Sequence, residues 1–150
     1  MRFTKFKKMN FLLQILTCNK IAAITLFPFG IYLSPEYYIS VNSLIRIHES
    51  IHWKQQKEMF FLGIIISTIS TIILIMNSVF LWWIFLLLAI FPFLFFYIWY
   101  VIEWFLKLIL PPFTQAYYRI SFEKEAYNNT YNNYLINRKN FAWLKYVFKK

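Results

Sequence analysis

Two histidines and a glutamate in one short stretch have the types and spacing of a metal site. The stretch His48-Glu49-Ser50-Ile51-His52 has the pattern HExxH and contains both histidines of the chain. On an α-helix, residues four apart lie one above the other on a single face. Two such imidazoles can bind one Zn²⁺, and the adjacent glutamate can take a proton from water. The spacing therefore predicts a zinc centre with Glu49 as its general base.

A centre of this type needs a third protein ligand from elsewhere, while its fourth position stays open. Where the set is two histidines and a glutamate, the carboxylate comes from far downstream. Glu123 and Glu125 are the candidates near the C-terminus. They point about 200° apart on a helix, so only one can serve easily. Glu103 is a further candidate, although an interfacial ion pair with Lys107 also explains it.

The motif leads into strongly apolar sequence. The chain is 60% hydrophobic and 15% charged, which excludes a disordered chain and points to a membrane protein. Residues 59–76 and 79–102 contain no charged side chain, and about 20 apolar residues span the hydrocarbon core of a bilayer. Only Asn77-Ser78 lies between them. The two runs therefore predict a tight transmembrane helical hairpin.

Lysine and arginine predict how this hairpin is oriented. Eight lie before Met59, eight lie after Ile102 and none lies between. By the positive-inside rule, both termini are cytoplasmic and the protein is a multi-pass protein of the cytoplasmic (inner) membrane. The HExxH helix, predicted over 42–58, then ends at the cytoplasmic membrane surface. The net charge of +10 fits membrane lipids as partners, and no nucleic-acid partner is expected.

The N-terminal part of the single predicted domain is more varied. Residues 1–20 are expected to form a basic segment that contacts the membrane, because no signal-peptide cleavage site follows. Residues 21–41 predict two or three short strands, at 24–27, 31–33 and 37–41. An extended edge near a metal helix can hold a substrate by strand addition. Cys18 is the only cysteine, so neither a disulfide framework nor a thiolate zinc site is expected.

The C-terminal part follows Pro111-Pro112, which ends the second span. Residues 113–150 are expected to form cytoplasmic helices that carry the glutamate ligand. Bases and aromatic residues alternate over 138–150, and this pattern favours a helix on the membrane surface.

Phe122-Glu123-Lys124-Glu125-Ala126-Tyr127 resembles a motif of known membrane enzymes. It is similar to E-x-x-A-D, the second motif of integral-membrane zinc peptidases of the HtpX and CAAX-prenyl-endopeptidase type, which are gluzincin-like. The first glutamate of that motif is the third zinc ligand, so the resemblance implies this role for Glu123. Tyr127 stands where that family has aspartate. The order of HExxH, membrane helices and glutamate helix is also similar.

Three longer stretches, HESIHWKQQKE, FYIWYVIEW and AYYRISFEKEAYNN, together resemble a group of small bacterial membrane proteins with HExxHxxQQ and FExEAY at matching spacing. We expect a mostly α integral membrane protein with a zincin-like HExxH helix. Its expected function is that of a zinc metallopeptidase, a hydrolase of peptide bonds in membrane or membrane-proximal proteins. His48, His52 and Glu123 would bind Zn²⁺, with Glu49 as the base. The alternative is a non-catalytic membrane protein with a structural or vestigial metal site.

Overall fold

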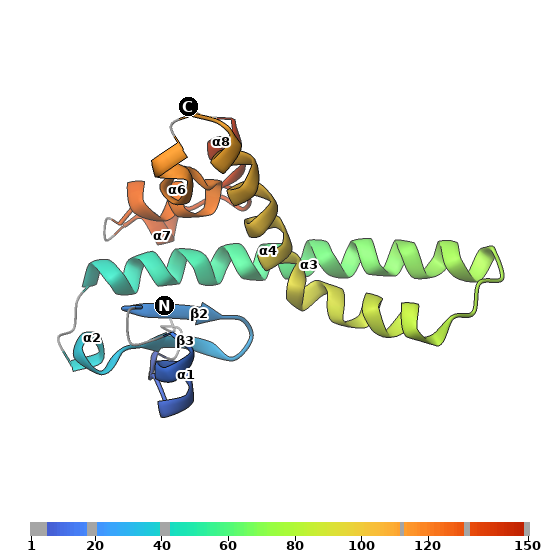
Figure 1. Ribbon diagram of the computed structural model, residues 1–150, viewed down its shortest axis with the longest axis horizontal. Coiled ribbons are helices and arrows are strands. Elements are labelled where there is room, and N and C mark those ends of the chain that lie inside the picture. Colours follow the sequence, from blue (N-terminus) through green and yellow to red (C-terminus); the bar gives the residue numbers. More distant parts are fainter. Residues whose placement is uncertain (1–5, 18–20, 40–42, 112, 131–132, 149–150) are drawn as a thin grey trace.

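One long helix, α3 (Ser43–Met76), is the axis around which the other elements are arranged (Figure 1). The computed structural model describes residues 6–17, 21–39, 43–111, 113–130 and 133–148. Within these ranges the chain is mostly helical with one small sheet and two long apolar helices, which confirms this part of the predicted fold. Cys18 and residue 42, where the HExxH helix is predicted to begin, lie outside the described residues.

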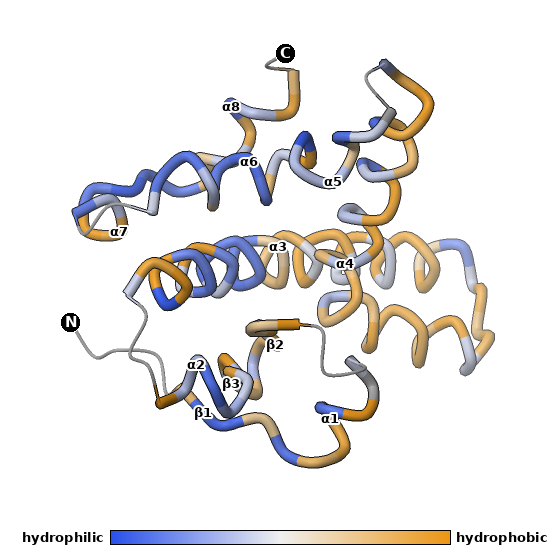
Figure 2. The backbone as a smooth tube through the Cα atoms, turned by 60° about the vertical axis from the view of Figure 1, so that its left-hand side comes forward, coloured by the Kyte–Doolittle hydropathy of each residue, from blue (hydrophilic) through white to orange (hydrophobic). Residues whose placement is uncertain are grey.

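Helix α3 combines two segments that the sequence analysis treats separately, the HExxH helix and the first apolar run. Its 34 residues are about 51 Å long at 1.5 Å per residue. The polar first half lies between the sheet on one side and the C-terminal helices on the other (Figures 1 and 2). The apolar second half extends away from these elements and lies beside α4 (Trp82–Ile109).

Helices α3 and α4 form a hairpin whose connection is longer than predicted. Helix α3 ends at Met76 because the Asn77 side chain donates to the carbonyl of Ile73 (2.8 Å) and Ser78 adopts a left-handed φ of 55°. Helix α4 starts only at Trp82, so the predicted start at residue 79 is wrong. It continues past residue 102 to Ile109, directly before the extended residue that precedes the prolines. By length and composition, α3 and α4 are each able to cross a membrane.

The two long helices approach each other closely at Gly63 of α3. A Cβ atom built on Gly63 would lie 2.8 Å from the Cα atom of Pro92 in α4. This is shorter than any ordinary contact, so the crossing requires glycine. A proline inside a helix bends it, and Figure 1 shows α4 bent where it crosses α3.

The sheet contains three strands in the order β1-β3-β2. Strands β2 (Ala23–Leu26) and β3 (Gly30–Leu33) form an antiparallel hairpin, and β1 (Phe6–Lys8) adds to β3 in parallel. Strand β1 was not predicted, since its segment has the composition of a basic arm. The predicted strand at 37–41 is wrong over 37–39, because Pro35–Ile39 form helix α2, and residues 40–41 lie outside the described residues. Proline is favoured in the first turn of a helix, and Tyr38 N donates to Ser34 O at 2.9 Å.

Six short helices complete the described chain. These are α1 (Phe11–Leu16) beside the sheet and, after α4, η1 (Phe113–Gln115), α5 (Ala116–Arg119), α6 (Ser121–Asn128), α7 (Tyr134–Asn137) and α8 (Leu144–Val147). The last five pack against α3 and α4 around a core of Met59, Phe96, Ile120, Phe122 and Trp143.

The predicted surface helix over 138–150 is wrong for most of its length. Of the described residues 138–148, only Leu144–Val147 are helical, and Trp143 is 3% exposed. The ring of Trp143 packs against that of Phe122 with centroids 4.7 Å apart. The alternation of bases and aromatic residues is also compatible with a segment that packs against the rest of the protein, as Trp143 does here.

Candidate metal centre

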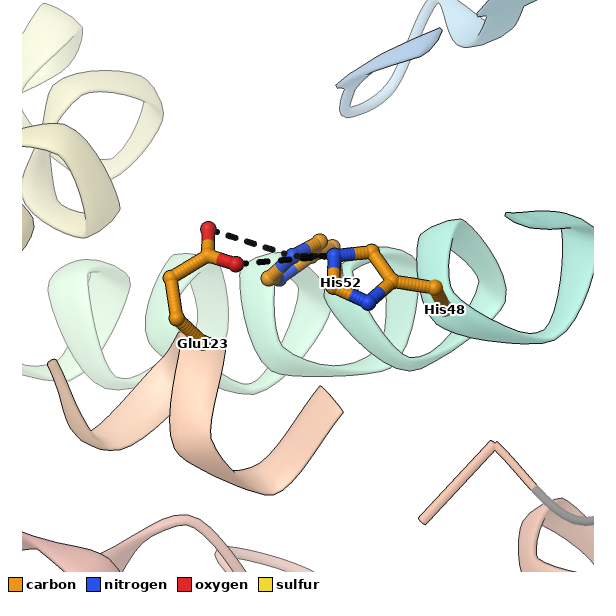
Figure 3. A group of neighbouring side chains, drawn as sticks. All are labelled: His48, His52 and Glu123. Carbon is orange, nitrogen blue, oxygen red and sulfur yellow. Dashed lines mark hydrogen bonds and ion pairs between the residues drawn. The ribbon is translucent and has the colours of Figure 1, made fainter. Parts of the chain in front are cut away.

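Three predicted metal ligands lie together between α3 and α6 (Figure 3). His48 and His52 are one turn apart on α3, and their Nε2 atoms are 3.0 Å apart. Glu123 of α6 faces both, with Oε2 3.5 Å from His48 Nε2 and Oε1 3.4 Å from His52 Nε2. Ligands of a tetrahedral zinc ion with bonds near 2 Å lie roughly 3.3 Å apart. The three side chains therefore have the spacing that one divalent cation needs.

The carboxylate of Glu123 lacks a partner that a cation would supply. Glu123 is 4% exposed, and its Oε2 is buried without a hydrogen-bond donor in the described part of the chain. Its Oε1 accepts from the hydroxyl of Tyr100 (3.1 Å). Burial alone would raise the pKa of Glu123, but the imidazoles of His52 and His48 outweigh it and hold this pKa well below its usual range. A buried anion needs a positive partner, which either protonated imidazoles or a bound cation would supply here.

Glu49 belongs to the same helix but contacts the sheet. The hydroxyl of Thr25 in β2 donates to Glu49 Oε2 (2.7 Å) and lies 3.1 Å from the Glu49 carbonyl oxygen. Glu49 is 8% exposed and does not belong to the group of three converging ligands. Its carboxylate is oriented by β2 through Thr25. A general base must reach the proton that it accepts directly or through one water. Sequence reasoning gave no role to Thr25, which lies in an unremarkable β-prone run.

Glu125, the first alternative ligand, faces away from the two histidines. It is fully buried and accepts hydrogen bonds from Arg138 Nε (2.6 Å), the Tyr134 hydroxyl (2.7 Å) and Gln55 Nε2 (2.9 Å). The guanidinium of Arg138 also pairs with Glu58 of α3. Glu125 thus joins α6 to α3 and to the C-terminal segment. Its donors leave Glu123 as the carboxylate that faces His48 and His52.

Glu103, the second alternative ligand, belongs to α4, and its carboxylate contacts the first residue of α6. Its carboxylate accepts from the backbone N–H (2.9 Å) and the hydroxyl (2.6 Å) of Ser121, the first residue of that helix. The predicted pair with Lys107 is present at 3.9 Å. A carboxylate at a helix N-terminus satisfies free N–H groups and stabilises the helix. Glu103 therefore holds the helix that carries Glu123.

A group of tyrosines forms one wall of the site. The ring of Tyr127 contacts those of His48 and Tyr118, with centroids 4.6 Å and 5.2 Å apart. Burial and the charge of Glu123 raise the pKa of Tyr127, and the same two causes raise the pKa of Tyr117. Both phenols therefore stay neutral at physiological pH. At the position where the resemblance leads one to expect an aspartate, an aromatic ring contacts a histidine.

Comparison with known proteins returns no match: no family model, no curated protein and no solved structure is similar to this chain. The arrangement of side chains is therefore the main basis on which a function can be proposed.

Proposed function

We propose that this chain is an integral membrane zinc metallopeptidase that hydrolyses peptide bonds of membrane or membrane-proximal proteins. The observation that carries the proposal is the convergence of His48, His52 and Glu123, whose ligand atoms lie within 4.8 Å of one another. Glu49 follows the first histidine directly and is positioned by β2. Two imidazoles and one carboxylate are the protein ligands of a recognised type of catalytic zinc site.

In this proposal the zinc ion and the side chains have separate chemical roles. A zinc ion bound here would act as a Lewis acid, which makes water more nucleophilic at neutral pH and polarises a peptide carbonyl. Glu49 accepts the proton of the attacking water and returns it to the amine that leaves. Thr25 keeps the Glu49 carboxylate in place through its 2.7 Å hydrogen bond. Strand β2 is an edge strand of the sheet, and an extended peptide could bind along such an edge.

The membrane location rests on α3 and α4. Both are long and apolar enough to cross a bilayer, and the large side chains of their apolar parts are mostly exposed. His52 precedes residue 59, where the apolar part of α3 begins, by seven residues, or about 10 Å along a helix. The metal site would then lie close to the cytoplasmic membrane surface. Reporters fused to either terminus should be cytoplasmic, and a tag beside Asn77 should be accessible from the opposite side only.

Metal content and cleavage test the proposal together. Purified wild-type protein should contain about one Zn²⁺ per chain, and His48→Ala and Glu123→Ala should lose it. Glu49→Gln should keep the zinc, since all three ligands remain, and should lower cleavage of co-expressed membrane proteins by about 10²–10⁴-fold. Glu36→Gln, which changes an exposed carboxylate of α2, is the matched control.

The outcomes separate the two candidate functions. Zinc content that is the same in wild type and in His48→Ala would exclude the metal site. Zinc that depends on the ligands, with cleavage that is unaffected by Glu49→Gln, would favour a non-catalytic protein with a structural metal site.

A further inference from the structure

Gln55 lies three residues after His52 on α3. Its side chain contacts His52 and also the part of α6 that carries Glu123. It is fully buried, and its Oε1 is 2.7 Å from His52 Nδ1. Its Nε2 donates to the carbonyl of Phe122 (3.0 Å) and to Glu125 Oε2 (2.9 Å). One glutamine side chain thereby joins a histidine ligand to the residue that directly precedes Glu123.

These contacts leave the amide of Gln55 only one orientation. The carbonyl of Phe122 can only accept a hydrogen bond, and carboxylate oxygens that face a guanidinium act as acceptors. Glu125 is paired in this way, with its Oε1 2.6 Å from Arg138 Nε and its Oε2 3.1 Å from Arg138 Nη2. The NH₂ group of Gln55 must therefore face Phe122 and Glu125. Its oxygen must face His52.

The orientation of this amide determines which nitrogen of His52 carries a proton. An amide oxygen accepts hydrogen bonds and cannot donate them, so His52 Nδ1 must be the donor. The lone pair of the neutral imidazole is then on Nε2, the atom that faces Glu123 at 3.4 Å. This is the tautomer that can bind a cation at the site.

We infer that Gln55 is the positioning residue of the metal centre. It fixes the proton of His52 on Nδ1, and it holds the backbone beside Glu123 against α3. Arg138 acts through Gln55, because its guanidinium donates to both oxygens of Glu125 and holds that carboxylate in place as the acceptor for the Gln55 amide. The inference rests on the proposed metal site and adds to it the residues that hold His52 and Glu123 in the arrangement that can bind a cation.

Gln56 provides a matched control for a merely structural role. It is also buried, at 5% exposure, and its amide accepts from Phe27 N (2.8 Å) and donates to Thr25 O (2.8 Å), whereas that of Gln55 has three partners. These bonds join α3 to the β2–β3 hairpin and do not involve either histidine. Replacing either glutamine by leucine removes a similar number of buried hydrogen bonds. Only the change at Gln55 should affect His52.

The test uses ¹⁵N-labelled histidine in the purified protein in detergent micelles, where two imidazoles give the whole signal. With or without zinc, wild type should show a proton on His52 Nδ1 that exchanges slowly with water. Gln55→Leu should lose this slow exchange, and Gln56→Leu should keep it. Chelator competition should show zinc affinity about 10–100-fold weaker in Gln55→Leu, the usual cost of a lost partner behind a metal ligand. Gln56→Leu should bind zinc like wild type.

A double variant that moves the carboxylate from position 125 to position 55 distinguishes a specific effect on the site from misfolding. Gln55→Glu alone places a second carboxylate against Glu125 and should weaken zinc binding. Adding Glu125→Gln restores a donor–acceptor pair between the two positions and keeps an acceptor for His52 Nδ1. Affinity should therefore recover in part, since the donor to the Phe122 carbonyl is still missing. Equal losses in Gln55→Leu and Gln56→Leu, or no recovery in the double variant, would overturn the inference. A protected Nδ1 proton in a wild type that binds no zinc would support the tautomer while ending the proposed function.

Discussion

Arg138→Met removes the one guanidinium that joins two glutamates behind the metal site. In wild type, Arg138 Nε lies 2.6 Å from Glu125 Oε1, and Arg138 also pairs with Glu58. The side chains of Arg138 and Glu125 are 1% and 0% exposed, and that of Glu58 is 11% exposed. Methionine fills a similar length of space without charge. The substitution therefore leaves Glu125 buried beside a second carboxylate without the guanidinium that pairs with both, and Lys54 is a remaining nearby cation.

The size of the effect follows from this burial. Burial alone would lower the pKa of Arg138, but the carboxylates of Glu58 and Glu125 raise it, so the guanidinium is charged at every pH used. Removing one partner of a buried ion pair costs about 3–5 kcal/mol, since the remaining charge is uncompensated. In a chain of this length, 1 kcal/mol lowers Tm by roughly 2–4 °C. Arg138→Met should therefore unfold roughly 6–20 °C below wild type.

Thermal unfolding in detergent micelles, followed by near-ultraviolet circular dichroism, measures this difference. Lys139→Met is the control, because it removes an exposed charge at the neighbouring position. The double variant Arg138→Met/Glu125→Gln should regain a large part of the lost Tm, since it buries a neutral amide in place of an unpaired carboxylate. If Arg138→Met unfolds at the same temperature as Lys139→Met, or if the double variant regains nothing, the ion pair does not stabilise this region.

Two further substitutions test the elements around the site. Thr25→Val keeps the side-chain shape but removes the donor to Glu49 Oε2. Because a hydrogen bond to a charged group contributes about 1.5–3 kcal/mol, cleavage should fall about tenfold or more while zinc content stays unchanged. A loss of zinc would contradict the separation of base and ligands. Gly63→Leu places a side chain against the backbone of Pro92 and should lower Tm, whereas Ser67→Ala one turn later, which removes a buried hydroxyl without a partner in the described chain, should leave Tm almost unchanged.

The sequence predicted those features that depend on local spacing. The positions of His48 and His52 on one helical face follow from the geometry of a single turn. The two long helices follow from apolar runs that contain no charged side chain. The end of α4 follows from two adjacent prolines. Each of these depends on residues close together in the chain, where propensity and periodicity are informative.

Features that depend on distant partners could not be predicted. Helical spacing showed that Glu123 and Glu125 point apart, but it could not show which of them faces the histidines. That choice depends on Arg138, which lies beyond α7 and also reaches back to Glu58 on α3. Strand β1 likewise exists because β3 offers it a parallel partner. For Tyr37, β propensity was outweighed by the local start of a helix at Pro35.

Helix α6 explains why the motif around Glu123 contains a second glutamate. It has only eight residues, and its own N-cap residue Ile120 makes no side-chain cap, so alone it would be unstable in water. Glu103 satisfies its first N–H from α4, and Glu125 attaches its opposite face to Gln55 and Arg138. A ligand on so short a helix can face a cation only if both its start and its far side are held. Gln55 and Glu125 therefore act together, because the hydrogen bond between them fixes the position of both side chains.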